Sequence, residues 1–275
     1  MMNLQVTATP SARMCAVIPT YNNPKTIGLV VEQVLRFIDT VFVVDDGSLE
    51  PGRVAVDALQ ETPGVVVLRR AQNGGKGAAV KDGLRAAHAA GYSHALQVDA
   101  DNQHELARIP DLLAESARHP EAVILAYPVF DETVPKGRLH ARKITIFWTT
   151  LETFGRSIID PMCGFRIYPV PATVQVLPKS NYMDFDPELA VRLIWSGTPA
   201  VNVPTRVRYL TAEQGGVSNF HVFYDNVRIS WMHTRLFTLS LFLFLFRPDK
   251  ILRARRAARA LKTRALGHGQ LAKSS

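Results

Sequence analysis

The chain has 275 residues, of which 47% are hydrophobic and 20% charged, so it can bury a full core and is not a disordered protein. Its two cysteines, Cys15 and Cys163, are too few for a disulfide framework, and we expect a reducing compartment. Residues 1–13 contain no basic segment followed by an apolar stretch, so we expect no signal peptide.

The formal net charge of +8 arises at the end of the chain. Residues 247–275 contain nine Lys or Arg and one Asp, so residues 1–246 are neutral overall. A protein that binds a phosphate backbone usually spreads its basic groups over a folded face. We therefore expect no nucleic-acid partner.

Short apolar runs alternate with helical patterns in the first half of the chain. The runs predicted as strands are 14–18, 41–44, 65–68, 94–98 and 122–126. The segments predicted as helices are 26–37, 51–61, 77–90 and 105–118. This alternation predicts an α/β fold whose mostly parallel sheet is covered by helices on both faces. Ligands of such sheets bind outside the carboxyl ends of the strands.

The second half of the chain is less regular. Helices are predicted at 135–154, which is basic and amphipathic, and at 186–195. A strand is predicted at 200–209, and the segments 160–169 and 215–219 are predicted as loops.

Two carboxylates follow the fourth predicted strand. Asp99 and Asp101 are two positions apart, and side chains at that spacing in a strand point the same way, so both can reach one cation. Oxygen ligands with an open side suit Mg²⁺ or Mn²⁺ shared with a diphosphate, and Gln103 adds a neutral oxygen. The alternative is an Asx turn in which Asp101 and Asn102 cap the next helix.

Two further polar clusters follow predicted strands. In Asp45-Asp46-Gly47-Ser48, a carboxylate is placed to accept hydrogen bonds from a ribose or base, although an ordinary turn is the alternative. Asn73-Gly74-Gly75-Lys76-Gly77 precedes a helix, whose N-terminus can face a diphosphate. Because Gly77 stands where a P-loop has Ser or Thr, this is not a P-loop. The absence of Gly-x-Gly-x-x-Gly after the first strand counts against a nicotinamide enzyme.

Four motifs now stand in order along the chain. They are Val17-Ile18-Pro19-Thr20-Tyr21-Asn22, Val43-Val44-Asp45-Asp46-Gly47-Ser48, Asn73–Gly77 and Asp99-Ala100-Asp101-Asn102-Gln103-His104. In order and spacing they resemble family 2 glycosyltransferases of GT-A fold, over about residues 15–209. The Asp-Ala-Asp-x-Gln-His form resembles the dolichol-phosphate or polyprenyl-phosphate mannose synthase branch. The resemblance implies a Rossmann-like nucleotide-diphospho-sugar transferase domain.

The resemblance implies a donor site. Pro19, Tyr21 and Asp46 match positions that hold the nucleoside, and Lys76 is included with them as a donor-binding residue. The predicted ligands of the metal and diphosphate are Asp99, Asp101 and Gln103.

The resemblance also implies an acceptor site. Arg138 and Arg142 are similar to arginines that face an acceptor phosphate, although a solvated helix face is the alternative, since they are four positions apart. Arg166 ends a segment similar to the Asp-x-x-x-Gly-Phe-Arg pattern of that branch, with Met162-Cys163 in place of the usual Thr-Ser.

A later segment, which contains Ser218 and His221, resembles more loosely the bacterial glycosyltransferases encoded with aryl-polyene assembly enzymes. Both residues are predicted to contact the acceptor. His221 could close over the diphosphate on a mobile loop, and a surface histidine is the alternative.

Asp186 and Asp101 are the predicted catalytic carboxylates. Asp186 matches the Phe-x-Phe-Asp-x-Glu pattern of relatives and would be the general base for a hydroxyl acceptor. The alternative is a helix N-cap with Pro187 at the first helical position. A phosphate acceptor is already anionic and would need no base.

Residues 236–246 are nearly all apolar and precede the basic stretch. As a helix these eleven residues would span roughly 16 Å, about half of a bilayer core, so we expect no membrane crossing. Apolar residues followed by basic ones favour an interfacial anchor on an anionic membrane, each basic group adding roughly 1 kcal/mol. The alternative is a core or dimer-interface helix with a solvated tail.

The leading hypothesis is a metal-dependent, inverting transfer of a sugar from a UDP- or GDP-sugar to a lipid-linked acceptor at the cytoplasmic membrane face. The acceptor is a polyprenyl phosphate or an acyl- or polyene-type hydroxyl. The predicted parts are an N-terminal tail (1–13), the GT-A glycosyltransferase domain (14–210), and an acceptor loop with an amphipathic, basic helical appendage (211–275).

Two other functions are compatible with an α/β nucleotide-binding domain. A sugar-phosphate nucleotidyltransferase should carry a Gly-rich, Arg-containing loop after the first strand, where this chain has Pro19-Thr20-Tyr21-Asn22-Asn23. A non-catalytic membrane-associated binding protein of the same fold is the other alternative, and the intact Asp99 and Asp101 argue against it.

Overall fold

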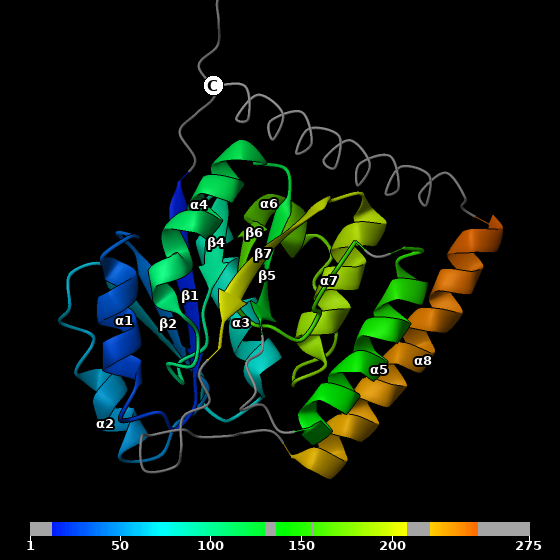
Figure 1. Ribbon diagram of the computed structural model, residues 1–275. Helices are drawn as coiled ribbons and strands as arrows, with labels where there is room; N and C mark the ends of the chain where they lie inside the picture. The colour runs from blue at the N-terminus through cyan, green and yellow to red at the C-terminus, as the bar shows by residue number, and fades with distance from the viewer. Residues whose placement is uncertain (1–12, 130–135, 156, 208–220, 247–275) are drawn as a thin grey trace, which may run out of the picture.

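The computed structural model describes residues 13–129, 136–155, 157–207 and 221–246. Its first half is a parallel sheet built from β1 (Met14–Thr20), β2 (Val41–Asp45), β3 (Val65–Arg69) and β4 (His94–Gln97). In this sheet β1 pairs with both β2 and β4, and β2 pairs with β3. The predicted strand–helix alternation is confirmed here, and the strands bring their carboxyl ends to one edge (Figure 1).

The remaining three strands extend this sheet in the order β3-β2-β1-β4-β6-β5-β7. They are β5 (Val123–Val129), β6 (Arg166–Pro169) and β7 (Ala200–Arg206). β6 runs antiparallel to β4 and β5, whereas β7 is parallel to β5. The prediction of a loop over 160–169 is therefore wrong for its last four residues, which pair with two neighbouring strands and are fully buried.

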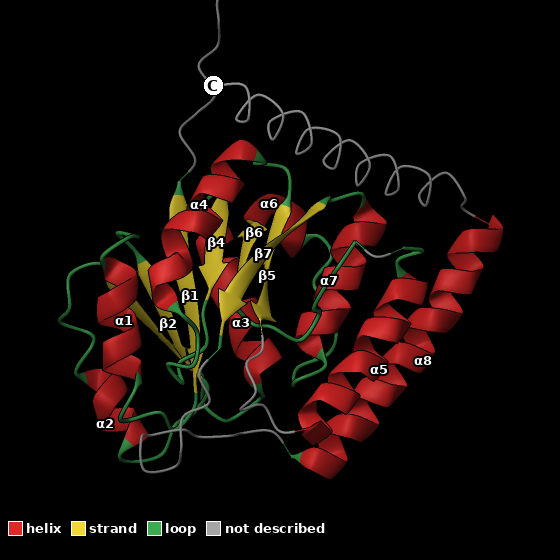
Figure 2. Ribbon diagram, in the orientation of Figure 1, coloured by secondary structure: helices red, strands yellow, loops and turns green. Residues whose placement is uncertain are grey.

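Helices cover both faces of the sheet (Figure 2). They are α1 (Ile27–Leu35), α2 (Gly52–Asp57), α3 (Lys76–Ala89), α4 (Ile109–Arg118), α5 (Lys136–Glu152), α6 (Val170–Val174), α7 (Phe185–Ser196) and α8 (Val222–Phe246). One buried apolar cluster lies under α1 and α4, and a second lies under α3 and α7. The predicted helix at 105–118 is divided, because a short 3-10 helix, Leu106–Arg108, precedes α4.

Helix α3 lies close to its neighbours because it carries small residues. A Cβ added at Gly83 would lie 2.4 Å from a methyl group of Val17 on β1, and one at Gly77 would lie 2.3 Å from Cβ of Phe185 on α7. The first turn of α3 therefore meets the first turn of α7. This contact brings together residues that are far apart in the sequence.

The helix near the end of the described chain, α8, is longer than the sequence predicted. The apolar run 236–246 is the last part of a helix of 25 residues that begins at Val222. The length estimate made for eleven residues is therefore wrong. Within the described residues, Phe223–Phe246 is the one helix long and apolar enough to cross a membrane by length and composition. Helices α5 and α8 lie side by side at one edge of the molecule (Figure 1).

Candidate active site

The glycine-containing turns after β2 and β3 are fixed to each other by Asp46. Its two carboxylate oxygens accept the backbone N–H groups of Gly74, at 2.9 Å, and Gly75, at 2.7 Å. Burial raises the pKa of Asp46, and these hydrogen bonds and Arg70 oppose that effect. A Cβ on Gly47 would lie 2.8 Å from the backbone nitrogen of Asn73, so a glycine is needed where the turns meet.

The residues predicted to hold the nucleoside lie around this point. Pro19 is buried on β1 and is paired in register with Val44 of β2. Tyr21 follows β1 and is half-buried, and its backbone N–H donates to the side chain of Asn23. Sequence and structure thus place Pro19, Tyr21 and Asp46 at the same edge of the sheet.

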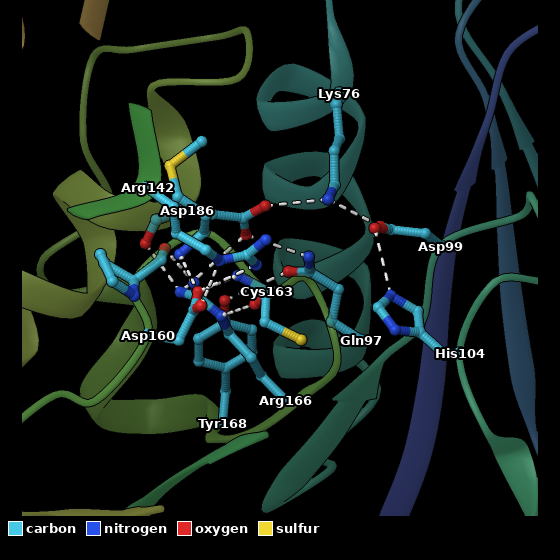
Figure 3. A network of polar contacts seen from close by, with 12 residues as sticks. Lys76, Gln97, Asp99, His104, Arg142, Asp160, Cys163, Arg166, Tyr168 and Asp186 are labelled. Atoms are coloured by element: carbon cyan, nitrogen blue, oxygen red, sulfur yellow. Dashed lines mark hydrogen bonds and ion pairs between the residues drawn. The ribbon is translucent and has the colours of Figure 1, made fainter. Parts of the chain in front are cut away.

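Lys76 connects two carboxylates at the centre of the site (Figure 3). It is the first residue of α3, and its Nζ atom lies 2.7 Å from Oδ1 of Asp99 and 2.8 Å from Oδ2 of Asp186. Burial alone would lower the pKa of Lys76, but Asp186 and Asp99 raise it above its ordinary value. The lysine therefore stays protonated between the end of β4 and the start of α7.

His104 holds the second oxygen of Asp99. Its Nε2 atom lies 3.3 Å from Asp99 Oδ2, and its ring stacks on Phe165 with the centroids 5.3 Å apart. Burial would raise the pKa of Asp99, but Lys76 and His104 hold it well below the usual range. Asp99 is consequently a carboxylate at any physiological pH.

The Asx turn of the alternative interpretation is present at Asp101, but it caps no helix, because the 3-10 helix and α4 have Glu105 and Arg108 as their N-caps. The backbone N–H of Gln103 donates to Oδ1 of Asp101 at 3.0 Å, and Asn102 has a left-handed φ of 57°. Burial and the nearby charge of Asp99 raise the pKa of Asp101. A cation bound between the two carboxylates would relieve the repulsion between Asp99 and Asp101.

The fit of these residues to a divalent cation can be judged from their donor atoms. Asp99, Asp101 and Gln103 offer oxygen ligands, which suit Mg²⁺ or Mn²⁺. Among the residues that the structure describes, no group of three or more His, Cys, Asp or Glu side chains could hold a metal ion. A cation held by Asp99 and Asp101 would have to take its remaining ligands from elsewhere, for which a bound diphosphate is suited, and the metal site stays a prediction.

Asp186 is oriented by two buried polar side chains, those of Gln97 and Tyr168. Nε2 of Gln97 donates to Asp186 Oδ1 at 3.0 Å, and the hydroxyl of Tyr168 donates to Gln97 Oε1 at 3.1 Å (Figure 3). The N-cap of α7 is Asp184, not Asp186, so the alternative assignment of Asp186 as the cap does not hold. The Asp186 side chain points to Lys76 and the strand ends instead.

Arg166 is completely buried beneath the site. Its guanidinium donates to the backbone oxygens of Cys163, at 2.6 Å, and Asp186, at 2.7 Å, and also to that of Pro161. Its predicted contact with an acceptor remains a prediction. Its hydrogen bonds support a different task, which is to hold the loop before β6 against the start of α7.

The loop before β6 is also tied to α5. Both oxygens of Asp160 interact with the guanidinium of Arg142, Nη2 lying 3.1 Å from Oδ1. Oδ1 of Asp160 also accepts the N–H groups of Met162 and Cys163 at 2.8 Å and 3.0 Å. Arg142 thus holds the loop before β6 through Asp160, and its contact with an acceptor stays a prediction.

The other predicted acceptor residues are less well defined. Arg138 lies on α5, but its side chain is not among those described, and Ser218 lies outside the described residues. His221 is exposed just before α8, and its backbone N–H donates to Oδ2 of Asp225 at 2.7 Å.

Sequence reasoning overlooked Gln97 and Tyr168, and it included Gly164 only as part of the Asp-x-x-x-Gly-Phe-Arg segment, without a role. A Cβ on Gly164 would lie 2.5 Å from Lys76 Nζ and 2.6 Å from Asp99 Oδ2, so this glycine leaves the space for their ion pair. One available signal was the amide of Gln97 at the end of a strand that is buried throughout.

Residues 15–172 match the family described as "Glycosyl transferase family 2", and this match spans more than half of the chain. The chain belongs to this family and is a glycosyltransferase of GT-A-like fold.

Among curated relatives, the polyprenol monophosphomannose synthase of Mycolicibacterium smegmatis is 35% identical over 217 residues, covering 72% of this chain and 78% of the relative. The undecaprenyl-phosphate mannosyltransferase of Micrococcus luteus is 32% identical over 168 residues, covering 57% of this chain and 66% of the relative. This chain thus spans slightly under two thirds of the Micrococcus protein.

Solved structures support the fold. Glucosyl-3-phosphoglycerate synthase from Mycobacterium tuberculosis, in complex with phosphoglyceric acid, is similar with a TM-score of 0.61 and 16% identity, over 82% of this chain and 80% of that one. The same enzyme in complex with Mn²⁺ and UDP-glucose gives a TM-score of 0.56 and 18% identity, over 74% of each chain.

Proposed function

We propose that this glycosyltransferase transfers a sugar from a UDP- or GDP-sugar to a polyprenyl phosphate. The observation that carries the proposal is the Lys76 ion pair with Asp99 and Asp186, next to the glycine turn fixed by Asp46. The names of the two mannosyl-transferring relatives support the acceptor class. Family membership supports inversion at the anomeric carbon, as the resemblance implies.

The donor would lie across the carboxyl ends of β1, β2 and β4. Pro19, Tyr21 and Asp46 would border the nucleoside, and the N-terminus of α3 would face the diphosphate. Asp99, Asp101 and Gln103 would hold Mg²⁺ or Mn²⁺, which supplies Lewis-acid neutralisation of the departing diphosphate when bound. Lys76 would add a second positive charge beside the phosphates, because its ammonium group stays protonated.

The acceptor would approach from the side of α5 and the loop before β6. A phosphate acceptor is already a nucleophile, so no proton has to be removed from it. Asp186 would then act by orienting Lys76, whereas a hydroxyl acceptor would use the same carboxylate as general base. Arg142, with Asp160 as its partner, and Arg138 on the same helix are the candidates to bind the acceptor phosphate.

The substitution Asp186→Asn distinguishes the two acceptor classes. With polyprenyl phosphate we expect a partial loss of turnover, whereas Asp99→Asn should abolish it. A hydroxyl acceptor would be favoured instead by two results together. Asp186→Asn would lower turnover as much as Asp99→Asn does, and the unchanged protein would transfer the sugar to a long-chain alcohol.

The proposed location is the cytoplasmic face of the cell membrane, with peripheral attachment. The nine Lys or Arg residues in 247–275 would be attracted to anionic lipid.

A screen of nucleotide-sugars by thermal shift, with and without Mn²⁺, tests the donor half of the proposal. A donor that binds the native state raises the melting temperature. We expect a UDP- or GDP-sugar to do so only with the cation, and to release its nucleoside diphosphate when polyprenyl phosphate is added. Turnover of a sugar phosphate with a nucleoside triphosphate would favour a nucleotidyltransferase, and binding without any turnover would favour a non-catalytic protein.

A further inference from the structure

Helix α8 buries several polar side chains and exposes many apolar ones, which is unusual for a helix in water. Its buried side includes polar residues, Asp225, His233 and Ser240, next to Ile229, Met232 and Leu236. Its exposed side carries an apolar stripe at helical spacing, formed by Phe223, Tyr224, Val227 and Trp231 and, beyond the exposed Thr234 and Thr238, by Leu241, Phe242 and Leu245. The exposed fraction of Trp231 is 66%.

Helix α5 shows the same inversion beside it. Its buried positions are Thr145, Thr149 and Glu152, whereas Ile144, Phe147 and Leu151 are exposed at spacings of three and four. The two helices run in the same direction. Trp148 contacts Phe237, and Phe154, which follows the end of α5, contacts Phe244 further along α8. The exposed stripes of α5 and α8 are named here the outward apolar face.

Buried ion pairs join helix α8 to α5 and to α7 of the sheet domain. Nδ1 of His233 lies 2.8 Å from Oε1 of Glu152, which joins α8 to α5. Glu188 on α7, fully buried, interacts with Arg192 of its own helix and with Arg235 of α8. Polar groups inside and apolar groups outside is the opposite of the arrangement that water favours.

We infer that the outward apolar face of α5 and α8 is inserted into the interfacial layer of an anionic lipid bilayer. The aromatic residues on the face are of the kind that membrane interfaces favour. The basic residues that follow Phe246 directly would add attraction to anionic headgroups.

The packing of α8 fixes its orientation. Ile229, Met232 and Leu236 of α8 lie against Val191 of α7, which belongs to the sheet domain. Because this packing keeps one side of α8 on the domain, the proposal places the helix along the bilayer surface and not across it. This inference deepens the proposed membrane attachment and rests on it, but it assigns the main contact to two helices of the fold and not to the tail alone.

Vesicle flotation of the full chain tests the inference. The probes are vesicles of phosphatidylcholine with phosphatidylglycerol, and vesicles of phosphatidylcholine alone. We expect Phe147→Asp and Trp231→Asp each to lower partitioning by about tenfold or more, because each places a charge where an aromatic ring is buried in lipid. The matched control is Leu29→Asp, which changes a residue on α1 that is 50% exposed at the opposite edge (Figure 1) and should float like the unchanged protein.

Tryptophan fluorescence provides a second readout that does not depend on a charged variant. Brominated lipids should quench the emission of the unchanged protein, and Trp231→Phe should remove most of that quenching. Absence of quenching, or flotation unaffected by both aspartate variants, would overturn the inference. So would light scattering that shows a dimer which Phe147→Asp dissociates, since the face would then cover a second copy.

The donor-dependent thermal shift should be retained in every variant. This control shows that the variants fold, and it separates failure of the membrane face from failure of the proposed transferase activity.

Discussion

The ammonium group of Lys76 lies 2.7 Å from the carboxylate of Asp99, in a space that exists because residue 164 is a glycine. The same ammonium reaches Asp186, so one positive charge joins the end of β4 to the start of α7. Under the proposed function, a cation and an anionic diphosphate that bind here would compete for the contacts between this lysine and its two carboxylates.

Replacing Lys76 with Met should leave two partly buried carboxylates without their shared partner. We expect the free energy of unfolding to fall by about 3 kcal/mol, because removing one member of a buried ion pair leaves the other uncompensated. Urea denaturation measures this change. The matched control is Lys25→Met, which removes an exposed lysine and should change stability little. Equal stability of the two variants would contradict the bridging role.

Replacing Gly164 with Ala should separate Lys76 from Asp99 without removing either charge. The added methyl group would lie 2.5 Å from Lys76 Nζ, so the side chains must move apart. We expect a loss of about 2 kcal/mol in stability, typical of overpacking, with a fall in metal-dependent donor binding. Gly28→Ala, where nothing lies within 4 Å of the new Cβ, is the control. If both variants bind the donor equally well, this contact is not needed.

The loss of thermal stability at acid pH should depend on Asp99. Its folded-state pKa lies well below the ordinary value of about 4, because Lys76 and His104 outweigh the effect of burial. A depressed folded-state pKa stabilises the fold above the unfolded-state pKa, and this stabilisation is lost as the pH falls through the folded-state value. The gap in melting temperature between the unchanged protein and Asp99→Asn should therefore narrow below about pH 4.

Calorimetry across this pH range measures that gap. The variant Asp39→Asn, at an exposed position, should show no comparable narrowing. A gap that is constant or widens on acidification would count against the ion pair.

Tyr168→Phe should weaken the orientation of Asp186 through Gln97. The substitution removes one buried hydrogen bond, which contributes about 1 kcal/mol, and leaves Gln97 Oε1 without this donor. We expect turnover to fall severalfold while the affinity for the nucleotide-sugar is unchanged. Steady-state kinetics separate these effects, with Tyr92→Phe, whose ring packs on Phe42 away from the site, as the control. A change in donor affinity alone would show that Tyr168 acts elsewhere.

Local sequence patterns were sufficient to predict the donor half of the fold. The strands ending near Thr20, Asp45 and Gln97 follow from apolar runs of ordinary length, and their parallel pairing places the three polar clusters at one edge. Asp99 and Asp101 could therefore be placed before any contact was known. Gln97 and Asp186, however, are separated by 89 positions, and only the packing of α3 against α7 brings them together.

The later half was less predictable for two physical reasons. β6 has four residues and begins with the charge of Arg166, and its pairing with β4 and β5 outweighs that local signal. The start of α8 was missed because Asp225 and His233 interrupt the apolar pattern from its buried side.

Transfer of a labelled sugar from a GDP- or UDP-sugar to polyprenyl phosphate is the most direct measurement of the central claim. The comparison is between the unchanged protein and Asp99→Asn, each with Mn²⁺ and with a chelator. We expect labelled polyprenyl-phosphate sugar only from the unchanged protein with Mn²⁺. Equal transfer by Asp99→Asn, or transfer that persists in the chelator, would contradict the account of the site.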